Sequence, residues 1–219
     1  MKRALIILIL ILSLSNALAS EELNIGDTLF FGKYEQDNIL ENGKEDLEWI
    51  VLDKQENKAL LITKYCIDTV IFYPERVPMY WGKSDLRAWM NDAFIKETFS
   101  PDEQSRIQVT INKNENPHGM KGAGDDTADM VFLLSKAELL HYFPNQEDRV
   151  AYPTELAISK GCTLDPKTGS CRWWTRTTGA RKMDVCGVRL DGRVSAYGMQ
   201  DVDWPTNTMR PIMWIKIND

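Results

Sequence analysis

Short apolar runs separated by polar turns predict three strands in the first part of the chain. The runs occupy residues 25–34, 47–52 and 59–63, and a polar stretch at residues 35–46 is expected to be a loop. The five polar residues at 53–57 predict a short hairpin connection between the last two runs. Strands joined by a hairpin pair antiparallel, so we expect an antiparallel sheet here.

Helices are predicted where an N-cap residue precedes apolar positions at helical spacing. Ser84 precedes an aromatic-rich apolar stripe that runs to Phe94, which predicts one amphipathic helix. Two capping boxes, each a serine followed three residues later by glutamate, predict a helix that starts after Ser100 and another over residues 136–142. A fourth helix is expected over residues 154–160, followed directly by a glycine.

The last part of the chain is predicted to consist of strands and turns. Trp173 and Trp174 stand side by side in one strand, and neighbouring strand side chains point to opposite faces, so both faces must be covered there. An Asp-Gly turn at positions 191–192 separates runs at residues 185–190 and 193–197, which is a strong hairpin signal.

Two further strands are expected at residues 130–134 and 209–215, and a glycine-rich loop at residues 118–129. Together with the short flanking helices, these elements predict an α+β fold built on a mixed, mostly antiparallel sheet. No repeat, linker or low-complexity tract interrupts the chain, so residues 20–219 are expected to form one domain.

The N-terminus has the composition of a secretion signal. Lys2 and Arg3 precede an apolar run at residues 4–12 and a small-residue cleavage site at residues 17–19, which predicts a signal peptide over residues 1–19. The run is shorter than the roughly 18–20 residues that span a membrane. We expect an exported protein, located in the periplasm, cell envelope or medium, without a stable membrane anchor. An uncleaved anchor is the alternative.

The charge of the chain argues against one class of partner. The net charge is −6, and the basic residues are dispersed, without a stripe of interleaved aromatic residues. Proteins that bind nucleic acid over a broad surface have the opposite charge balance. We therefore expect no nucleic-acid partner.

Four cysteines in an exported protein predict two disulfides, for which three pairings exist. Cys162 and Cys171 flank a turn-rich loop whose closure would stabilise the fold by on the order of 2–3 kcal/mol, so we expect this pair first. Cys66 and Cys186 would form the second pair. The alternative is that one or both pairs stay reduced.

Four sequence blocks follow one another along the chain. The first consists of Trp81, Ser84, Leu86, Arg87, Trp89, Met90, Asn91, Phe94, Phe99, Ser100, Glu103 and Ile107. The others are residues 129–135 (Asp-Met-Val-Phe-Leu-Leu-Ser), residues 173–179, which begin with the two tryptophans, and Arg210-Pro211. In this order the blocks resemble those of a bacterial domain of unknown function (number 6273), over about residues 25–217.

That family resembles the C-type-lectin-like fold, which also includes formylglycine-generating enzymes and retroelement-diversified binding proteins of bacteria. The resemblance implies a single C-type-lectin-like domain whose ligand face is built from late loops. Thr175, Thr178 and Met209 differ from the commoner residues of the family blocks, which we interpret as variation in packing.

Arg87, Arg176 and Arg210 lie within the family blocks, each close to tryptophan or proline. A planar guanidinium stacks on indole and bridges carboxylates or carbonyls, so we expect these arginines to lock a tryptophan-rich core. A structural role is also assigned to three tryptophans: Trp89, Trp173 and Trp174. The alternative role for the arginines is to anchor a ligand.

The late segment at residues 189–207 carries the expected binding residues. Aromatic side chains beside carboxylates and amides supply stacking area and oriented hydrogen bonds, which suits a carbohydrate, peptide or protein ligand. The residues assigned to binding are Arg193, Tyr197, Asp201, Asp203, Trp204 and Asn207. The alternative is a solvated loop with one packed tryptophan.

Catalysis and metal binding have weak signals in the sequence. His118 and His141 stand in no recognisable triad or zinc spacing. Two carboxylate clusters, at residues 125–129 and 201–203, contain oxygen ligands of the kind that calcium prefers, but without EF-hand spacing a solvated acidic loop is favoured. We expect a non-catalytic recognition module without a cofactor. The alternatives are a formylglycine-generating-type oxidoreductase, which needs a closely spaced cysteine pair, and a structural envelope protein.

Overall fold

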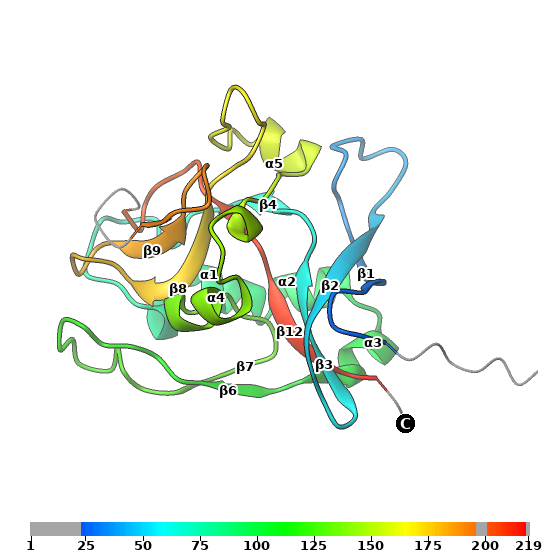
Figure 1. Ribbon diagram of the computed structural model, residues 1–219, viewed down its shortest axis with the longest axis horizontal. Coiled ribbons are helices and arrows are strands. Elements are labelled where there is room, and N and C mark those ends of the chain that lie inside the picture. The colour runs from blue at the N-terminus through cyan, green and yellow to red at the C-terminus, as the bar shows by residue number, and fades with distance from the viewer. Residues whose placement is uncertain (1–22, 196–200, 218–219) are drawn as a thin grey trace, which may run out of the picture.

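Two five-stranded sheets and a separate hairpin form the strand framework of the computed structural model, which describes residues 23–195 and 201–217. The first sheet has the order β1-β2-β3-β12-β5, and its pairings are antiparallel (Figure 1). Its strands are β1 (Thr28–Tyr34), β2 (Glu45–Gln55), β3 (Lys58–Thr63), β12 (Ile212–Lys216) and β5 (Ile107–Gln108). The antiparallel pairing predicted around residues 53–57 is confirmed.

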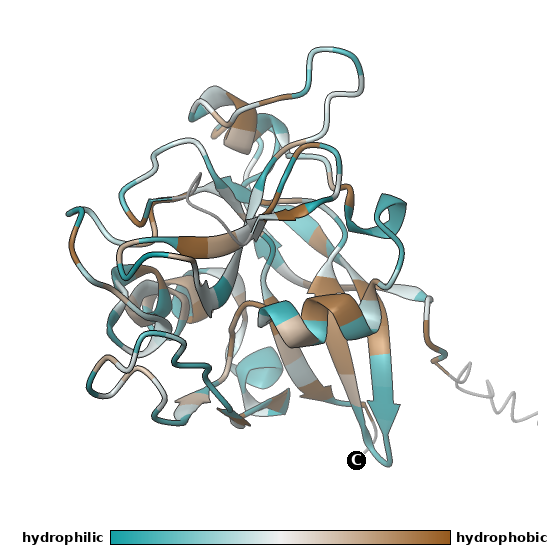
Figure 2. Ribbon diagram, turned by 60° about the vertical axis from the view of Figure 1, so that its left-hand side comes forward, coloured by the Kyte–Doolittle hydropathy of each residue, from teal (hydrophilic) through white to brown (hydrophobic). Residues whose placement is uncertain are grey.

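Alternation along β2 defines the side of this sheet that faces the core. Leu47, Trp49 and Val51 are at most 1 % exposed, whereas Glu48 and Ile50 between them are half-buried. Because strand side chains alternate between faces, one face of the sheet carries the core residues. Figure 2 shows apolar residues along these strands and polar residues at the tip of the β2–β3 hairpin.

The second sheet joins late strands to one early strand in the order β10-β9-β8-β11-β4. Its strands are β10 (Val194–Ser195), β9 (Val185–Val188), β8 (Trp173–Thr178), β11 (Thr208–Met209) and β4 (Asp68–Thr69). The β8–β11 pairing is parallel, and the other pairings are antiparallel. The predicted class, α+β with mixed and mostly antiparallel strands, is confirmed at this level.

The single strand predicted at residues 209–215 is two strands in different sheets. β11 pairs with β4 and β8, whereas β12 pairs with β3 and β5. Pro211 stands between them and has no N–H to continue a ladder, but its carbonyl accepts a hydrogen bond from the Thr63 N–H at 3.1 Å. The chain therefore crosses from one sheet to the other at this proline.

Short helices flank the sheets. The helices are α1 (Asp85–Met90), α2 (Ala93–Thr98), α3 (Pro101–Arg106), α4 (Lys136–Tyr142) and α5 (Glu155–Ser159), with 3-10 turns η1 (Trp81–Lys83) and η2 (Glu147–Arg149). Both predicted capping boxes are present: in each, a serine side chain accepts the backbone N–H of a glutamate whose carboxylate accepts the N–H of that serine.

The helix predicted from Ser84 to Phe94 is two helices, because Asn91 bonds outside the helix. Its side-chain amide donates to the Val131 carbonyl at 2.8 Å, and its side-chain oxygen accepts the Met130 N–H at 2.8 Å. These bonds tie the end of α1 to the segment at residues 130–131, and α2 starts afresh at Ala93. Tertiary hydrogen bonds thus end a helix that the apolar spacing alone would continue.

The predicted strand at residues 130–134 is wrong in type but right in burial. Residues 131–134 are buried, yet only Phe132 makes a strand-like bridge, with reciprocal backbone bonds of 2.9 Å to Ile212. Regular pairing lies just before this segment, in the hairpin of β6 (Thr110–Asn112) and β7 (Thr127–Asp129). The predicted glycine-rich loop is most of the connection within that hairpin.

The ring of Phe72 joins the second sheet to η1 in the core. The ring of Phe72 lies 5.8 Å from that of Trp174 and 6.2 Å from that of Trp81, measured between centroids.

The predicted signal peptide falls outside the described residues. Among the residues that are described, no helix has the length and apolar character needed to cross a membrane.

Candidate functional site

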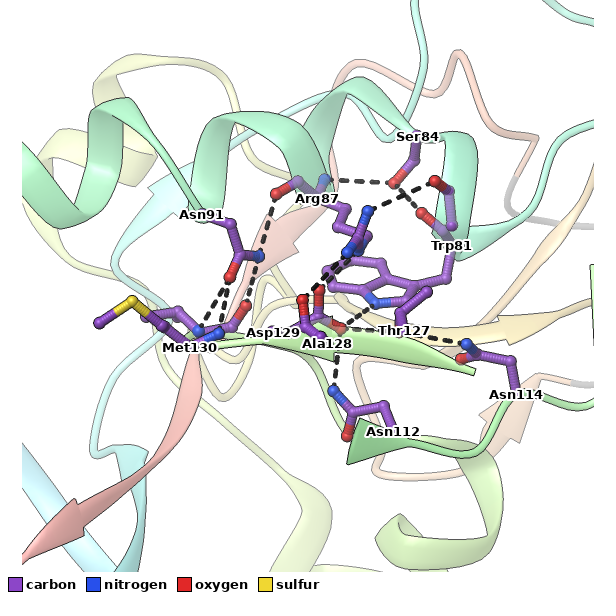
Figure 3. A network of polar contacts seen from close by, with 12 residues as sticks. Trp81, Ser84, Arg87, Asn91, Asn112, Asn114, Thr127, Ala128, Asp129 and Met130 are labelled. Carbon is purple, nitrogen blue, oxygen red and sulfur yellow. Dashed lines mark hydrogen bonds and ion pairs between the residues drawn. The ribbon is translucent and has the colours of Figure 1, made fainter. Parts of the chain in front are cut away.

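A buried carboxylate, that of Asp129, is the centre of a dense polar network (Figure 3). The residue is 1 % exposed, and its Oδ1 accepts the Nε–H of Arg87 at 2.6 Å. Its Oδ2 accepts hydrogen bonds from Trp81 Nε1 at 3.0 Å and Asn112 Nδ2 at 2.9 Å. The hydroxyl of Thr127 donates to the same oxygen at 2.8 Å. Four donors therefore satisfy one carboxylate, which leaves it little capacity to bind a metal or act as a base.

This network fixes three separate elements against one another. Trp81 belongs to η1, Arg87 to α1, and Asn112, Thr127 and Asp129 to the β6–β7 hairpin. A buried carboxylate with an ion-paired arginine is costly unless every lone pair is bonded, and here the bonds come from all three elements. We assign the Asp129 network a structural role.

Arg176 forms a second structural clamp. Its side chain is 2 % exposed and pairs with Glu138 through both terminal nitrogens, with Nη2 at 2.7 Å from Oε1. Nη1 also donates to the Leu133 carbonyl at 2.7 Å. Burial acts to raise the pKa of Glu138, but the hydrogen bonds and charge of Arg176 outweigh it and hold that pKa below its ordinary range. The pair joins α4 to β8.

The lowered pKa of Glu138 predicts an acid-dependent contribution to stability. A carboxyl with a lower pKa in the folded state stabilises the fold above its unfolded pKa, and this contribution is lost as pH falls through the folded pKa. We expect Glu138→Gln to lower the free energy of unfolding by about 1 kcal/mol at neutral pH, allowing for the partial exposure of Glu138. In urea titrations the wild-type advantage should shrink as the pH falls below the ordinary pKa range of a glutamate carboxyl, and disappear once Glu138 is protonated in the folded state. Glu155→Gln, at an exposed first-turn position of α5, is the control; an advantage that stays equal as the pH falls would contradict this account.

Arg210 stacks within the tryptophan-rich core, as expected for a structural arginine. Its guanidinium carbon lies 5.4 Å from the Trp173 ring centroid and 5.5 Å from that of Phe143, and its Nε donates to the Thr63 carbonyl at 2.8 Å. Trp173 and Trp174 are both 0 % exposed. Their indole N–H groups donate to backbone carbonyls at 3.1 and 2.9 Å.

Trp89 has a different environment from the other tryptophans assigned a structural role. It is half-buried and lines an open groove of about 580 Å³, which we call the Trp89 groove. The groove is lined by Tyr34, Asp68, Thr69, Val70, Ile71, Asp85, Leu86, Trp89, Glu97 and Lys160. These residues come from the end of β1, from β4 and the residues after it, from α1 and α2, and from the residue that follows α5. Four stretches that are distant in sequence, one of which contains both α1 and α2, therefore build one concave surface.

A set of fixed polar groups in the Trp89 groove is centred on Asp68, which is 2 % exposed. Its carboxylate accepts the Tyr34 hydroxyl at 2.6 Å and pairs with Lys160 Nζ at 2.7 Å. Burial and the charge of Asp68 raise the pKa of Tyr34, so its hydroxyl stays a hydrogen-bond donor at neutral pH. These three groups bind one another and form a rigid part of the wall.

Two further carboxylates of the groove, Asp85 and Glu97, are exposed. Within the described part of the chain, neither side chain has a hydrogen bond or an ion pair. Asp85 and Trp89 are one helical turn apart on α1 and lie on the same face. An indole ring and two unpaired carboxylates thus face the same open space.

A larger hollow of about 840 Å³ lies beside Phe30 and is a weaker candidate. Its polar groups are mostly bonded within the fold: Lys33 pairs with Asp46 at 2.8 Å, and Lys44 Nζ donates to the Glu97 carbonyl at 2.6 Å. Glu103 accepts the Gly32 N–H at 2.8 Å and closes the capping box of α3. The larger space has fewer groups free to bind a ligand.

Comparison with known proteins identifies the family of the chain. The model of a family described as a domain of unknown function (DUF6273) matches residues 56–217. The chain belongs to this family. No curated protein and no solved structure matches it. The DUF6273 match begins after β2, whereas the sequence blocks led us to expect the family resemblance to begin at about residue 25. Strand β1, which contains Tyr34, therefore lies outside the matched region.

The blocks that resemble DUF6273 motifs mainly build the structural networks. Trp81, Arg87 and Asp129 meet in one network, and Arg176 and Arg210 each hold backbone carbonyls. Trp89 is the exception, because its ring lines the groove. Nothing in the sequence marks Asp68 and Lys160 as partners, since they lie 92 positions apart and belong to no motif. The polar and aromatic types of the groove residues are the only feature of the sequence from which this groove could have been predicted.

Two of the late residues assigned to ligand binding are buried in this DUF6273 structure. Asp201 is 7 % exposed and is held by Arg76 at 2.7 Å and Arg181 at 2.8 Å. Asn207 is 0 % exposed, and neither of its side-chain amide atoms has a hydrogen-bond partner among the described residues. Neither side chain faces solvent, so neither is placed for surface binding.

The other late residues do not share one face with them. Arg193 is exposed and pairs with Asp191 at 2.6 Å. Trp204 and Asp203 are half-buried, and the Trp204 indole N–H donates to Thr206 Oγ1 at 2.8 Å. Tyr197 lies outside the described residues. The described structure thus divides the predicted binding set between the interior and the surface.

The carboxylate clusters considered for calcium also separate. Asp129 is saturated by its four donors, Asp126 pairs with Lys113, and Asp201 pairs with arginines. Among the described residues, one acidic group brings three ligand atoms within 4.8 Å of one another: Glu35, Asp37 and Glu45. Its carboxylates accept backbone N–H groups of their own loop, such as Gln36 N at 2.6 Å from Glu45. This arrangement stabilises the loop.

All four cysteines are free thiols in this structure, which gives no support to the predicted bridge between Cys162 and Cys171. Register explains why: Leu164, not Cys162, lies opposite Cys171 in an antiparallel bridge, which leaves Cys162 two positions out of line. The thiol of Cys171 instead contacts that of Cys66. The backbones of both cysteines are hydrogen-bonded to the segment 151–153. The Cys66 N–H donates to the Tyr152 carbonyl, and the Cys171 N–H donates to the Ala151 carbonyl, each at 2.9 Å.

We expect oxidative refolding to join Cys66 to Cys171, because these buried thiols are the pair already in contact. Peptide mapping after refolding in a glutathione redox buffer should recover the peptides of these two cysteines as one linked species. Cys66→Ser should remove that species, whereas Cys186→Ser should leave it intact. A bridge between Cys162 and Cys171 would contradict the geometry.

An enzyme of the formylglycine-generating type needs a closely spaced cysteine pair, and Cys66 with Cys171 is such a pair, but both residues are 0 % exposed and therefore closed to a substrate. Cys186 lies on β9, and its carbonyl accepts a hydrogen bond from the Thr175 hydroxyl at 2.7 Å. Thr175 is four positions along the chain from Cys171, about 13 Å in an extended strand. Burial raises the pKa of the Cys186 thiol to about 11, so it is protonated at neutral pH. His118 Nε2 bonds the Gly179 carbonyl at 2.8 Å, and the His141 ring packs against Tyr142.

Proposed function

We propose that this DUF6273 protein is a non-catalytic recognition module that binds a positively charged group in the Trp89 groove. The observation that carries the proposal is the indole of Trp89 beside two exposed, unpaired carboxylates, Asp85 and Glu97. An ammonium or guanidinium group gains from an aromatic face and from carboxylates at the same time. The charged group can belong to a basic peptide or to an amino sugar.

The charge balance of the groove favours a cation over a neutral sugar. Asp68 and Lys160 neutralise each other, so Asp85 and Glu97 leave the groove with a net negative charge. Complementary potential speeds association and excludes ligands of the wrong sign. A groove of about 580 Å³ is also within the ordinary size range for sites that hold a small group or a side chain.

The wider proposal keeps the setting expected from the sequence. The protein would be exported by cleavage of residues 1–19 and would act in the periplasm, envelope or medium. Its two sheets and short helices would be a variant of the C-type-lectin-like fold. In this variant the ligand occupies the Trp89 groove rather than a face built from residues 189–207.

Ligand arrays probed with two matched variants test this function. Basic peptides, amino-sugar oligosaccharides and neutral oligosaccharides would be presented to wild type, Trp89→Ala and Trp204→Ala, both at half-buried tryptophans. We expect capture of basic peptides or amino sugars that Trp89→Ala weakens about tenfold or more and Trp204→Ala leaves unchanged. Weaker binding by Trp204→Ala and unchanged binding by Trp89→Ala would indicate that the ligand binds the late loops at residues 189–207. Loss of binding in both variants with an equal loss of melting temperature would assign both residues to the fold, and no capture by wild type would refute the proposal.

A further inference from the structure

Two arginines lie close to each other just past the end of the β8–β9 ladder. The ladder ends with the pair of Trp173 and Val188, and Arg172 and Arg189 are the residues next to that pair, close enough for the charge of Arg189 to act on Arg172. Like charges held close together across two strands destabilise the fold. Arg172 and Arg189 line a small hollow of about 160 Å³, together with Asp165, Leu190 and Asp191.

The carboxylates of this hollow are already engaged. Asp191 pairs with Arg193 at 2.6 Å, and the Asp165 carboxylate accepts the backbone N–H groups of Lys167 and Thr168 at 2.8 and 3.0 Å. Within the described part of the chain, no carboxylate lies within ion-pair distance of Arg172 or Arg189, and the buried Nε of Arg172 has no hydrogen-bond partner. Burial and the charge of Arg189 lower the pKa of Arg172. The charge of Arg189 also acts on Asp191 across the hollow and lowers its pKa, but no carboxylate among the described residues forms an ion pair with either arginine.

We propose that Arg172 and Arg189 form a binding pocket for a single oxyanion, a carboxylate, sulfate or phosphate group of a ligand. A guanidinium fork matches the geometry of these groups and makes two hydrogen bonds to one of them. The anion supplies the counter-charge to both arginines and an acceptor for the Nε–H of Arg172. This pocket uses none of the residues of the Trp89 groove, and the proposal does not depend on the function assigned to that groove.

The test measures thermal unfolding in low millimolar sulfate, phosphate or acetate, against chloride at equal ionic strength. Low concentrations avoid the general stabilisation of proteins by sulfate. We expect a saturable rise of the melting temperature in wild type with at least one of the three ions, and the effective ion or ions distinguish a tetrahedral from a planar group. Arg172→Gln and Arg189→Gln should each weaken binding about tenfold. Lys167→Gln removes an exposed charge of the neighbouring loop, outside the pocket lining, and should leave binding unchanged.

A second readout separates binding from folding. Without anion, Arg189→Gln should raise the melting temperature by about 2 °C, because it removes a like-charge contact. A purely structural arginine would show the opposite sign. The absence of a saturable response in wild type, or a response in both arginine variants that equals the wild-type response, would overturn the proposal. Trp89→Ala should keep the anion response, so failure of the groove and failure of this pocket are distinguishable.

Discussion

Replacing Asp129 with asparagine is expected to lower the melting temperature by about 10 °C, from a loss of about 3 kcal/mol. The carboxylate accepts four hydrogen bonds in the interior, and the asparagine amide would turn an NH₂ group toward some of the same donors. Arg87 would also lose its ion partner. Since the network joins η1, α1 and the β6–β7 hairpin, the loss should affect the whole fold.

Asp126→Asn is the matched control for this prediction. Asp126 lies three residues earlier, just before β7, and its 40 % exposed side chain pairs with the exposed Lys113. An exposed pair of this kind contributes at most about 1 kcal/mol. Scanning calorimetry of both variants measures the difference. Equal melting temperatures would show that the Asp129 network does not stabilise the fold.

The second large effect is expected at Gly192, in the turn between β9 and β10. Its φ is +81°, and a Cβ added there would lie 2.0 Å from the backbone oxygen of Gln146. Its own carbonyl accepts the Nε–H of Arg149 at 2.9 Å, so the turn is fixed against η2. Gly192→Ala should cost about 3 kcal/mol or more, from left-handed strain added to a backbone clash.

Gly169→Ala separates these two causes. Gly169 has a similar φ of +75°, but a Cβ built there would meet nothing within 4 Å. This variant should therefore lose only about 1 kcal/mol from conformational strain. Urea titrations of the two variants should differ by about 2 kcal/mol or more, and equal losses would show that the turn moves freely to accept a side chain.

Local signals in the sequence were sufficient for elements whose structure is decided locally. The capping boxes at Ser100 and Ser135 start α3 and α4 at the expected residues. The polar turn at residues 53–57 gives the β2–β3 hairpin. Where tertiary contacts intervene, local reasoning failed. Asn91 ends α1 through bonds to residues 130–131, and the crossing at Pro211 divides the last strand between two sheets.

The candidate sites were harder to predict, because their parts are distant in sequence. Tyr34, Asp68 and Lys160 meet only after β1, β4 and α5 have packed together. Nearness in sequence suggested that Cys162 would pair with Cys171, but the register places Leu164 opposite Cys171 and brings Cys66 to its thiol. Family motifs identified the residues that hold the fold, whereas most groove residues lie outside those motifs.

The most direct test of the proposed function is the affinity of the strongest cationic ligand from the arrays, measured by isothermal titration calorimetry. The proteins are wild type, the double variant Asp85→Asn with Glu97→Gln, and a control, Asp92→Asn, at an exposed carboxylate outside the groove lining that pairs with Lys96. The double variant is predicted to bind about tenfold more weakly and to lose most of its salt dependence, while the control binds like wild type. Unchanged affinity in the double variant would contradict the assignment of the Trp89 groove as a cation-binding site.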